Sequence, residues 1–413
     1  MAAIFEGLKV IDLSQVAAVP MTTRILADFG ADVVHVENLE TGDIFRHTLV
    51  GSQTSTQAEV NYVWEHYNRN KRSMTLDITK KTGQEVLHRL LSTADIFATN
   101  LRPYQLEKFN LEYETLQKLN PRLIAAYLSG LGKEGDEKDY PAYDHTAYWA
   151  RSGIPHKLRA MAPALREPGA ILPAFIPAFG DHVSGLALCA SIILALYGRE
   201  RTGLGREVTG SLFQSGVYQM SWDVAAALTT GEDCLSIDPE KDILNPLYAQ
   251  YLTKDGRWLL FTALNPLRYM PQILRAMDRE DLIEDPRFAT IESFVENQAF
   301  LRDIMSSTFI TKDLKEWVEI LNNERVPYSP VQNFTEIVND PQARANGFFE
   351  SYEHPEYGRI EGVANPVNIG ENEKSVRMPG PEFGQHTEEI LLEHGYDWDD
   401  IIRFQEEGVI AGG

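Results

Sequence analysis

The sequence predicts an α/β protein in which a large, doubly wound domain is joined to a smaller α+β domain. Strand-like and helical segments alternate through the first half of the chain, which is typical of a parallel sheet covered by helices on both faces. An acidic, glycine-containing stretch at 230–242 resembles a linker, and beyond it the pattern changes to a hairpin followed by helices. The 413 residues suffice for more than one core.

The first elements predict a βαβ unit. Residues 7–13 alternate in hydrophobicity and are rich in β-branched side chains, 21–29 have helical spacing and end at Gly30, and 33–37 are strand-like again. The same alternation recurs in helices and strands at 83–93, 95–99, 116–119 and 123–128. We therefore expect a parallel, Rossmann-like sheet flanked by helices.

The later elements predict how the chain divides into domains. Residues 155–180 contain five prolines and cannot form one uninterrupted helix, so we expect a loop that shapes a substrate site. The patterns that follow predict, in order, a helix at 182–200, a turn at 202–206, a strand at 207–209, a helix at 212–228, a hairpin at 251–261, helices up to 326, a turn at 355–358 and a last amphipathic helix at 388–394. We expect a large domain at 1–228, a small domain at 229–330 and a segment returning to the large domain at 331–413.

Composition excludes several classes of function. With 38 basic and 60 acidic residues, the net charge of −22 repels nucleic acids and anionic membranes, so neither is an expected partner. The first residues lack the basic start and apolar core of a signal peptide, and the two cysteines, Cys189 and Cys234, offer no disulfide framework, so we expect a cytoplasmic protein. The apolar run 183–197 is 15 residues long, shorter than the ~20 needed to cross a bilayer.

Common catalytic and cofactor motifs are missing from the sequence. The first turn, 14–20, lacks the glycine fingerprint that cradles dinucleotide phosphates, which disfavours nicotinamide and flavin cofactors. The chain also lacks a serine nucleophile elbow, a His-Glu-x-x-His zinc motif and a Walker loop. We therefore expect no metal and no permanently bound cofactor.

Asp181 has two interpretations. It lies between Gly180 and a long apolar helix, where an aspartate is most often an N-cap that accepts backbone N–H groups. In the other interpretation Asp181 is a nucleophile: a carboxylate is ionised at neutral pH and attacks a carbonyl without a separate base, while Gly180 and Gly185 leave room for a thioester. The helix N-terminus would then hold developing negative charge.

Other polar residues have a structural and a functional interpretation each. Tyr143, Asp144 and His145 stand in succession near the predicted end of the α/β unit and form either a helix cap or part of a site. His182 either polarises a carbonyl or covers the first helical turn. Four basic residues are either solvated or bind phosphate: Arg46, Lys71, Arg72 and Arg102.

Ordered motifs along the chain resemble a known family. They include residues 7–13, 26–33, 42–43, 70–71, 100–103, 120–124, 129–132 and 201–205. In order and spacing these motifs resemble family III CoA-transferases, of the formyl-CoA transferase and carnitine CoA-transferase type, and the match covers nearly the whole chain. The segment 141–153 and the triplet 180–182 look most like members that act on 2-hydroxy acids, such as phenyllactate and 2-hydroxyisocaproate CoA-transferases.

The resemblance implies a mechanism and a set of site residues. It implies that Asp181 attacks an acyl-CoA thioester to give an anhydride, that the CoA thiolate returns to give an aspartyl-CoA thioester, and that a second carboxylate repeats the steps in reverse. Coenzyme A thioester is then a substrate. The residues placed along CoA by the resemblance are Val16, Ala17, Ala18, Asn100, Leu101, Arg102 and Tyr143. Lys71 joins them as a CoA-binding candidate because a basic side chain matches phosphate oxygens. The candidates for contacting or polarising the substrate are Gln15, His145 and His182.

The sequence departs from the family pattern at three places. Some members carry Gln where this chain has Ala17, and a basic residue where it has Asn38. A glycine-rich flap found in some members is replaced by residues 262–266. We therefore expect the CoA contacts at Ala17 and Asn38, and the cover of the site, to differ from those of such members.

Two alternative functions stay open. An α-methylacyl-CoA racemase uses a His and an Asp as acid and base; the family's racemases have that His immediately before the position of Asp144, where this chain has Tyr143. A non-catalytic subunit of a hetero-oligomer should lack the nucleophile, whereas this chain has Asp181. The resemblance also implies a homodimer in which each chain forms a ring threaded through the other.

Overall fold

A single parallel sheet organises the large domain. The computed structural model describes residues 3–47, 58–162, 176–233, 245–370 and 374–411. Six strands, all parallel to their neighbours, lie in the order β3-β2-β1-β4-β5-β6. Their bounds are β1 Lys9–Leu13, β2 Asp32–Glu37, β3 Arg72–Thr75, β4 Ile96–Thr99, β5 Ile124–Ser129 and β6 Glu207–Ser211. The predicted α/β class and parallel sheet are confirmed, and the order is that of a doubly wound fold whose switch point lies between β1 and β4.

Helices cover both faces of this sheet. Successive side chains of a strand point to opposite faces, so Val10 packs with α1 and α7 on one face while Ile11 packs with α3 and α5 on the other. Large-domain helices are α1 Ala18–Asp28, η1 Ile44–His47, α2 Tyr62–Asn68, α3 Lys81–Leu91, α4 Pro103–Phe109, α5 Tyr113–Leu119, the π-helix η2 Asp144–Ala150, α6 Ile154–Met161, α7 Phe179–Thr202, α8 Leu212–Gln219 and α9 Ser221–Thr230.

The C-terminal segment returns to the large domain. Its last helices, α15 Thr387–Glu393 and α16 Trp398–Glu406, bury Ile390 and Phe404 in the same core cluster as Ile11. The backbone N–H of Asp77 donates to the carbonyl of Val409 at 2.8 Å. Before them come α13 Phe334–Asn339, α14 Pro341–Ala345 and a two-stranded antiparallel hairpin, β10 Phe349–His354 and β11 Gly358–Val363.

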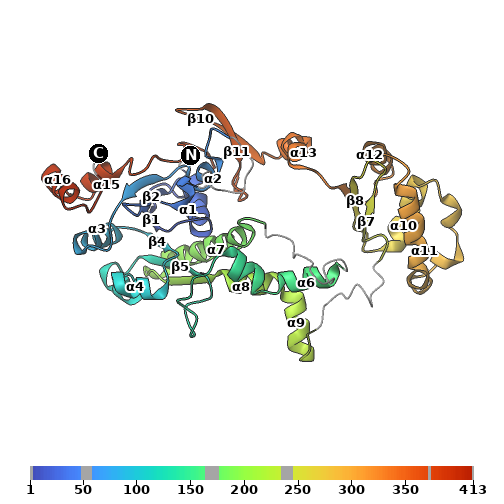
Figure 1. Cartoon of the computed structure of the whole chain (residues 1–413), viewed down its shortest axis with the longest axis horizontal. Coiled ribbons are helices and arrows are strands. Elements are labelled where there is room, and N and C mark those ends of the chain that lie inside the picture. Colours follow the sequence, from blue (N-terminus) through green and yellow to red (C-terminus); the bar gives the residue numbers. More distant parts are fainter. Residues whose placement is uncertain (1–2, 48–57, 163–175, 234–244, 371–373, 412–413) are drawn as a thin grey trace.

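A second core forms the small domain, which stands apart from the sheet in Figure 1. A three-stranded antiparallel sheet, β7-β8-β9, packs with helices around the buried Trp317. Its elements are β7 Gln250–Leu252, β8 Trp258–Phe261, α10 Pro266–Ala276, η4 Glu280–Leu282, η5 Pro286–Phe288, α11 Ile291–Phe309, α12 Leu314–Asn323 and β9 Tyr328–Pro330. The expected hairpin is present. The domain boundaries at 228 and 330 stay a prediction.

Several expected elements differ from the structure. Helix α7 begins at Phe179, three residues earlier than expected, and part of the expected loop at 155–180 is helix α6, whose Pro155 sits in the first turn where its missing N–H costs nothing. Residues 163–175 of that loop, and 234–242 of the expected linker, lie outside the described residues. The expected helix at 212–228 is two helices, α8 and α9, with Met220 between them. Strand β3 and helix α2 were not expected.

Helix α7 is a core helix of a soluble protein. With 24 residues and a mean hydropathy of 1.7 in its most apolar window, it is the one helix of the described residues long and apolar enough to cross a membrane. One side of it is buried against α1 and the sheet, through Leu188 and Ile192. The other side exposes Leu194 and Tyr197.

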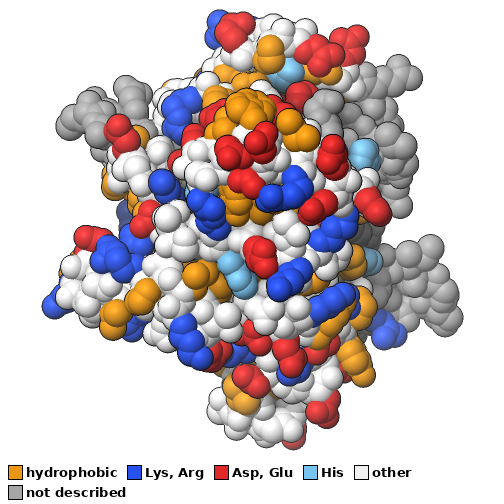
Figure 2. Space-filling model, turned by 90° about the vertical axis from the view of Figure 1, so that its left-hand side faces the viewer, with side chains coloured by type: hydrophobic (Ala, Val, Ile, Leu, Met, Phe, Trp, Pro, Cys, Tyr) orange, Lys and Arg blue, Asp and Glu red, His pale blue; other side chains and the backbone are white. Residues whose placement is uncertain are grey.

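The surface charge is mixed where Figure 2 views the molecule. On that face, acidic and basic side chains are interspersed with scattered hydrophobic ones. Among the surface ion pairs, Arg72 on β3 binds Glu393 at the end of α15, at 2.9 Å. The net charge of −22 is therefore not gathered into one acidic patch on this face.

Candidate active site

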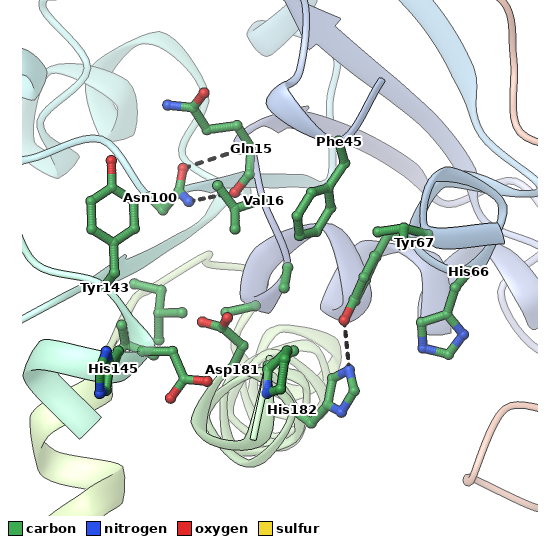
Figure 3. Close-up of a pocket in the computed structure, with 18 of the residues that line it drawn as sticks. Gln15, Val16, Phe45, His66, Tyr67, Asn100, Tyr143, His145, Asp181 and His182 are labelled. Atoms are coloured by element: carbon green, nitrogen blue, oxygen red, sulfur yellow. Dashed lines mark hydrogen bonds between the residues drawn. The ribbon is translucent and has the colours of Figure 1, made fainter. Parts of the chain in front are cut away.

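A cavity of about 1300 Å³ opens at the carboxyl ends of the central strands (Figure 3). Its walls come from the turns after β1, β4 and β5, the start of η2, the start of α7, helix α2 and the hairpin β10–β11. In doubly wound folds the crevice outside the strand ends at the switch point is where ligands bind. The cavity is therefore the candidate active site.

Asp181 lies in the first turn of α7, as its third residue, and lines the cavity. Figure 3 shows its carboxylate directed from α7 toward the turn at Val16. The N-cap residue is Ala178, in a left-handed conformation with φ of 58°. The N-cap interpretation of Asp181 was therefore wrong. Asp144 takes over part of the capping instead, because its Oδ1 accepts the backbone N–H of Gly180 at 3.1 Å.

The two glycines near Asp181 serve close packing. A Cβ on Gly180 would lie 2.2 Å from the ring of Tyr148 and 2.4 Å from Oδ1 of Asp144. A Cβ on Gly185 would lie 2.5 Å from the carbonyl oxygen of Ala18 on α1. The interpretation that these glycines leave room for a thioester was therefore wrong: they let α7 approach η2 and α1.

The electrostatics of the site favour a protonatable Asp181. Burial raises the pKa of Asp181 to about 7, and the negative charge of Asp144 adds to the rise. Burial also raises the pKa of Asp144, although the backbone N–H of Gly180 opposes this. Near neutral pH, Asp181 thus changes between a neutral acid and a weakly solvated carboxylate.

The turn after β1 is fixed to the turn after β4. The backbone N–H of Gln15 donates to Oδ1 of Asn100 at 3.3 Å, and Nδ2 of Asn100 donates to the carbonyl of Gln15 at 2.8 Å. Val16 follows with φ of 74°, a conformation that costs energy for a β-branched residue. These bonds join the two strands on either side of the switch point at the edge of the cavity.

Basic side chains lie on the same side of the cavity as Asn100. Arg102 lines the cavity, and its guanidinium donates to the carbonyl of Asp139 at 3.2 Å and to Oη of Tyr104 at 2.8 Å. Lys138 lines the cavity as well. Arginine and lysine match phosphate oxygens, so this side suits a phosphate-bearing ligand.

An aromatic and polar wall lies on the other side of Asp181 in Figure 3. The ring of Phe45 stacks on Tyr67 with centroids 5.2 Å apart. Oη of Tyr67 and Nε2 of His182 are hydrogen-bonded at 2.8 Å. The ring of His66 lies edge-on to Tyr67, and burial lowers its pKa well below the usual value, so it is a neutral imidazole.

Lys71 is not part of the cavity. It is fully buried, and its Nζ donates to Oδ2 of Asp12 at 2.9 Å and to Oδ1 of Asn68 at 3.0 Å. His35 contacts the same carboxylate, with Nδ1 3.1 Å from Oδ2 of Asp12. Lys71 thus neutralises a buried acid instead of reaching a ligand.

Two of the other basic candidates are also engaged elsewhere. The Arg46 guanidinium lies 3.8 Å above the ring of Trp64 and binds Glu37 at 2.6 Å. Arg72 binds Asp32 at 2.6 Å. Among Arg46, Lys71, Arg72 and Arg102, only Arg102 lines the cavity.

The structure brings together most of the residues singled out from the sequence. The predicted residues that line the cavity are Gln15, Val16, Ala17, Ala18, Asn100, Leu101, Arg102, Tyr143, His145, Asp181 and His182. His145 follows Asp144 at the start of η2. The roles of these cavity-lining residues in binding and catalysis stay predictions. Sequence reasoning missed Phe45, His66 and Tyr67, which belong to short helices without a motif, and the hairpin residues Phe349, Tyr352, Ile360 and Val363, which come from the far end of the chain.

Comparison with known proteins identifies relatives over the whole chain. Residues 5–387 match the model of CoA-transferase family III. The chain is 33% identical to the (R)-2-hydroxy-4-methylpentanoate CoA-transferase of Clostridioides difficile, covering 98% of this chain and 99% of the relative. It is 31% identical to the cinnamoyl-CoA:phenyllactate CoA-transferase of Clostridium sporogenes, covering 98% and 96%. A solved structure of a CAIB/BAIF family protein from Brucella suis is similar with a TM-score of 0.76 and 25% identity, covering 95% of this chain and 100% of that one.

A doubly wound sheet with a ligand cavity and a partly buried carboxylate at its switch point defines an α/β enzyme that acts on a small molecule. The family model and the two relatives identify which class of enzyme this is. The chain belongs to CoA-transferase family III. It is a CoA-transferase, which transfers CoA between carboxylic acids and takes an acyl-CoA as substrate.

Proposed function

We propose that this enzyme moves CoA from an acyl-CoA to a free 2-hydroxy acid with an aryl or branched side chain, and that Asp181 carries the reaction. The observation that carries the proposal is the position of the Asp181 carboxylate, in the first turn of α7 and facing the cavity. The two relatives named above support the acid class, since their names are those of CoA-transferases for 2-hydroxy-4-methylpentanoate and phenyllactate.

The proposed chemistry converts one thioester into another through anhydride intermediates, so no further source of energy is needed. The Asp181 carboxylate attacks the thioester carbonyl, forming an anhydride and releasing the CoA thiolate. The thiolate attacks the carbonyl carbon of Asp181, so the donor acid leaves as its carboxylate and Asp181 holds CoA as a thioester. The acceptor carboxylate then attacks this thioester, and the thiolate released attacks the acceptor's carbonyl in the second anhydride. Asp181 is regenerated as a carboxylate.

The surroundings of Asp181 support the steps of this reaction: binding CoA, stabilising the oxyanion and activating the nucleophile. The CoA moiety would lie along residues 16–18, 100–102 and Tyr143, where Arg102 and Lys138 offset the unfavourable net charge of the chain. Backbone N–H groups and the dipole at the start of α7 would stabilise the oxyanion that develops at the attacked carbonyl. A carboxylate whose pKa is raised by burial is a stronger nucleophile once ionised.

The quaternary structure proposed is an interlocked homodimer. The small domain stands apart from the large one (Figure 1), which leaves large apolar side chains of α7, α8 and α9 uncovered in the single chain. The most exposed are Leu228 at 82%, Tyr218 at 80% and Trp222 at 76%. Apolar groups of this size in solvent favour a partner surface, and a second copy threaded through the first would supply it.

The decisive experiment traps CoA on the protein. Wild-type enzyme is incubated with an acyl-CoA in the absence of an acceptor, and its intact mass and peptide map are measured. A CoA adduct on the peptide of Asp181, lost in Asp181→Asn, is the expected result. The matched control is Asp399→Asn, because Asp399 is also a first-turn aspartate of a helix but is exposed on α16.

A second assay identifies the acids. The enzyme is incubated with a panel of acyl-CoAs and free acids, and new acyl-CoAs are detected by mass, with Asp181→Ala as the inactive variant. Exchange that requires Asp181 supports the proposal. Scrambling of the stereochemistry of a 2-methylacyl-CoA without exchange would contradict it and indicate racemase chemistry instead.

A further inference from the structure

The cavity has a second end that the CoA moiety does not need. This end is formed by α2, the start of α7 and the hairpin β10–β11, which is held to α2 by the hydrogen bond from Oη of Tyr352 to Oε2 of Glu65, at 2.7 Å. We propose that Tyr67 and His182 at this end recognise a hydroxyl group on the acyl carbon next to the thioester. The inference rests on the proposed function and names the residues that select its substrate class.

The pair is placed next to the reacting carbonyl. His182 is the residue after Asp181 in the first turn of α7, and its Nε2 lies 2.8 Å from Oη of Tyr67. Figure 3 shows both side chains on one side of Asp181, whereas Asn100 and Tyr143 lie on the other. If CoA extends toward Asn100, the acyl group extends toward Tyr67. A substituent on the acyl carbon next to the thioester would then contact Tyr67 and His182.

The pair is rigid and uncharged. Tyr67 is 5% exposed and stacked by Phe45, so its ring is fixed. Burial raises the pKa of Tyr67, with the charge of Asp181 adding to this, so it remains a phenol. Burial lowers the pKa of His182, and the charge of Arg24 acts in the same direction, which keeps the imidazole neutral.

A hydroxyl group is the substituent that fits this pair. One hydrogen is shared between Oη of Tyr67 and Nε2 of His182, which leaves the phenol oxygen able to accept a further hydrogen bond or to donate one, according to the histidine tautomer. A hydroxyl satisfies either arrangement, since it both donates and accepts. A hydrogen or methyl at the same carbon would cover the phenol oxygen without replacing a hydrogen bond.

The same end disfavours a second carboxylate. Among the described residues that line it, the one permanently charged cation is Arg69, which is ion-paired with Glu350 and also lies 3.5 Å from Oδ2 of Asp28. The remaining lining includes apolar side chains, namely Phe45, Val60, Val63, Ile360 and Val363. The class that fits is therefore a 2-hydroxyacyl group with an apolar side chain, and not a dicarboxylic one.

Binding to a turnover-deficient enzyme tests the inference apart from the reaction. In the Asp181→Asn background, dissociation constants are measured by calorimetry for 2-hydroxy-4-methylpentanoyl-CoA and 4-methylpentanoyl-CoA, which differ only in the hydroxyl. We expect the hydroxylated ligand to bind more tightly, and Tyr67→Phe to reduce the ratio of the two constants by about tenfold, the effect of losing one hydrogen bond. His182→Phe should reduce the ratio in the same direction.

The matched control is Tyr127→Phe. Tyr127 is also buried, and its Oη donates to the carbonyl of Leu111 at 2.8 Å, but it does not line the cavity, so the ratio should stay at the starting value. Equal binding of the two ligands, or a ratio that Tyr67→Phe leaves unchanged, overturns the inference. In wild-type enzyme, the kcat/KM ratio for the two free acids should follow the binding ratio. Absence of all CoA transfer would overturn the proposed function, while the binding ratio still decides the role of Tyr67.

Discussion

The carboxylate of Asp43 accepts the backbone N–H of Val16, with Oδ2 3.2 Å and Oδ1 3.4 Å from the nitrogen. The same carboxylate accepts the N–H of Phe45 at 2.8 Å. Asp43 thereby joins the turn proposed to contact CoA to the aromatic wall proposed to contact the acyl group. Because Val16 adopts φ of 74°, which is unfavourable for a β-branched residue, this bond stabilises a conformation that the turn would not otherwise keep.

Replacing Asp43 should loosen the CoA-binding turn. In Asp43→Ala the N–H of Val16 loses its acceptor, so we expect weaker acyl-CoA binding, measured by calorimetry, and a loss of about 1–3 kcal/mol in the free energy of unfolding. Asp77→Ala is the control, because Oδ1 of Asp77 accepts the N–H of Thr79 at 2.9 Å in a turn outside the cavity. Unchanged acyl-CoA affinity in Asp43→Ala would show that the turn holds without this bond.

The raised pKa of Asp181 predicts a pH-dependent cost to stability. Asp181 binds its proton more tightly in the folded protein, where its pKa is about 7, than in the unfolded chain, where it is 3.8. The folded state is therefore destabilised as pH rises from about 4 to 7. Urea unfolding should show Asp181→Asn equal to wild type near pH 4 and more stable by up to about 4 kcal/mol at pH 8. A difference that does not vary with pH would contradict the raised pKa.

The pKa of His35 predicts that folding stability is again lost as pH rises, but over a higher pH range than for Asp181. Burial alone would lower the pKa of His35, but the adjacent Asp12 and Asp43 carboxylates raise it to about 9. Its stabilising charge is fully present below pH 6.5 and is lost as pH rises through 9. The stability advantage of wild type over His35→Gln, measured by urea unfolding, should therefore shrink between pH 6.5 and 9. An advantage constant over that range would exclude a charged His35.

Gly180→Ala should disturb the start of α7. The added Cβ would collide with Tyr148 and with Asp144, so we expect a loss of about 1–3 kcal/mol and a lower transfer rate. Gly198→Ala is the control in the same helix: the nearest atom to its Cβ is Nε of Arg206 at 3.5 Å, and a gain of about 0.5–1 kcal/mol is expected. Thermal unfolding measures the stability of both variants, and the CoA-exchange assay measures their transfer rates. Equal stability and rate in Gly180→Ala and Gly198→Ala would refute the role of Gly180 in packing α7 against η2.

The proposed dimer predicts an association defect. Trp222→Glu places a charge on the exposed apolar surface of α9, and sedimentation should then show a monomer where the wild type is a dimer. Glu200→Gln provides a control, since Glu200 is an exposed residue near the end of helix α7. A wild-type chain that sediments as a monomer would remove the basis of this proposal.

How far the sequence predicts this structure depends on whether the signal is local. The strands β1, β2, β4 and β5 are rich in apolar and β-branched residues, so their pattern predicted them, whereas the short β3 carries Arg72 and Ser73 and was missed. Asp181 was singled out by its place before an apolar helix. Tyr67 was not, because its partner His182 is 115 positions away and no spacing rule connects them. Lys71 was placed beside CoA because a basic side chain matches phosphate, while its burial against Asp12 depends on three strands meeting.

The return of the C-terminal segment has a consequence for how the molecule is made. One face of the central sheet is covered in part by Ile390, Phe404 and Val409, which are synthesised after the small domain. The small domain has a core of its own and is complete once residues up to Pro330 have emerged. During synthesis the small domain can therefore finish folding before the large domain does. Strands β1 and β2 must wait for α15 and α16 before their apolar face is shielded from other nascent chains.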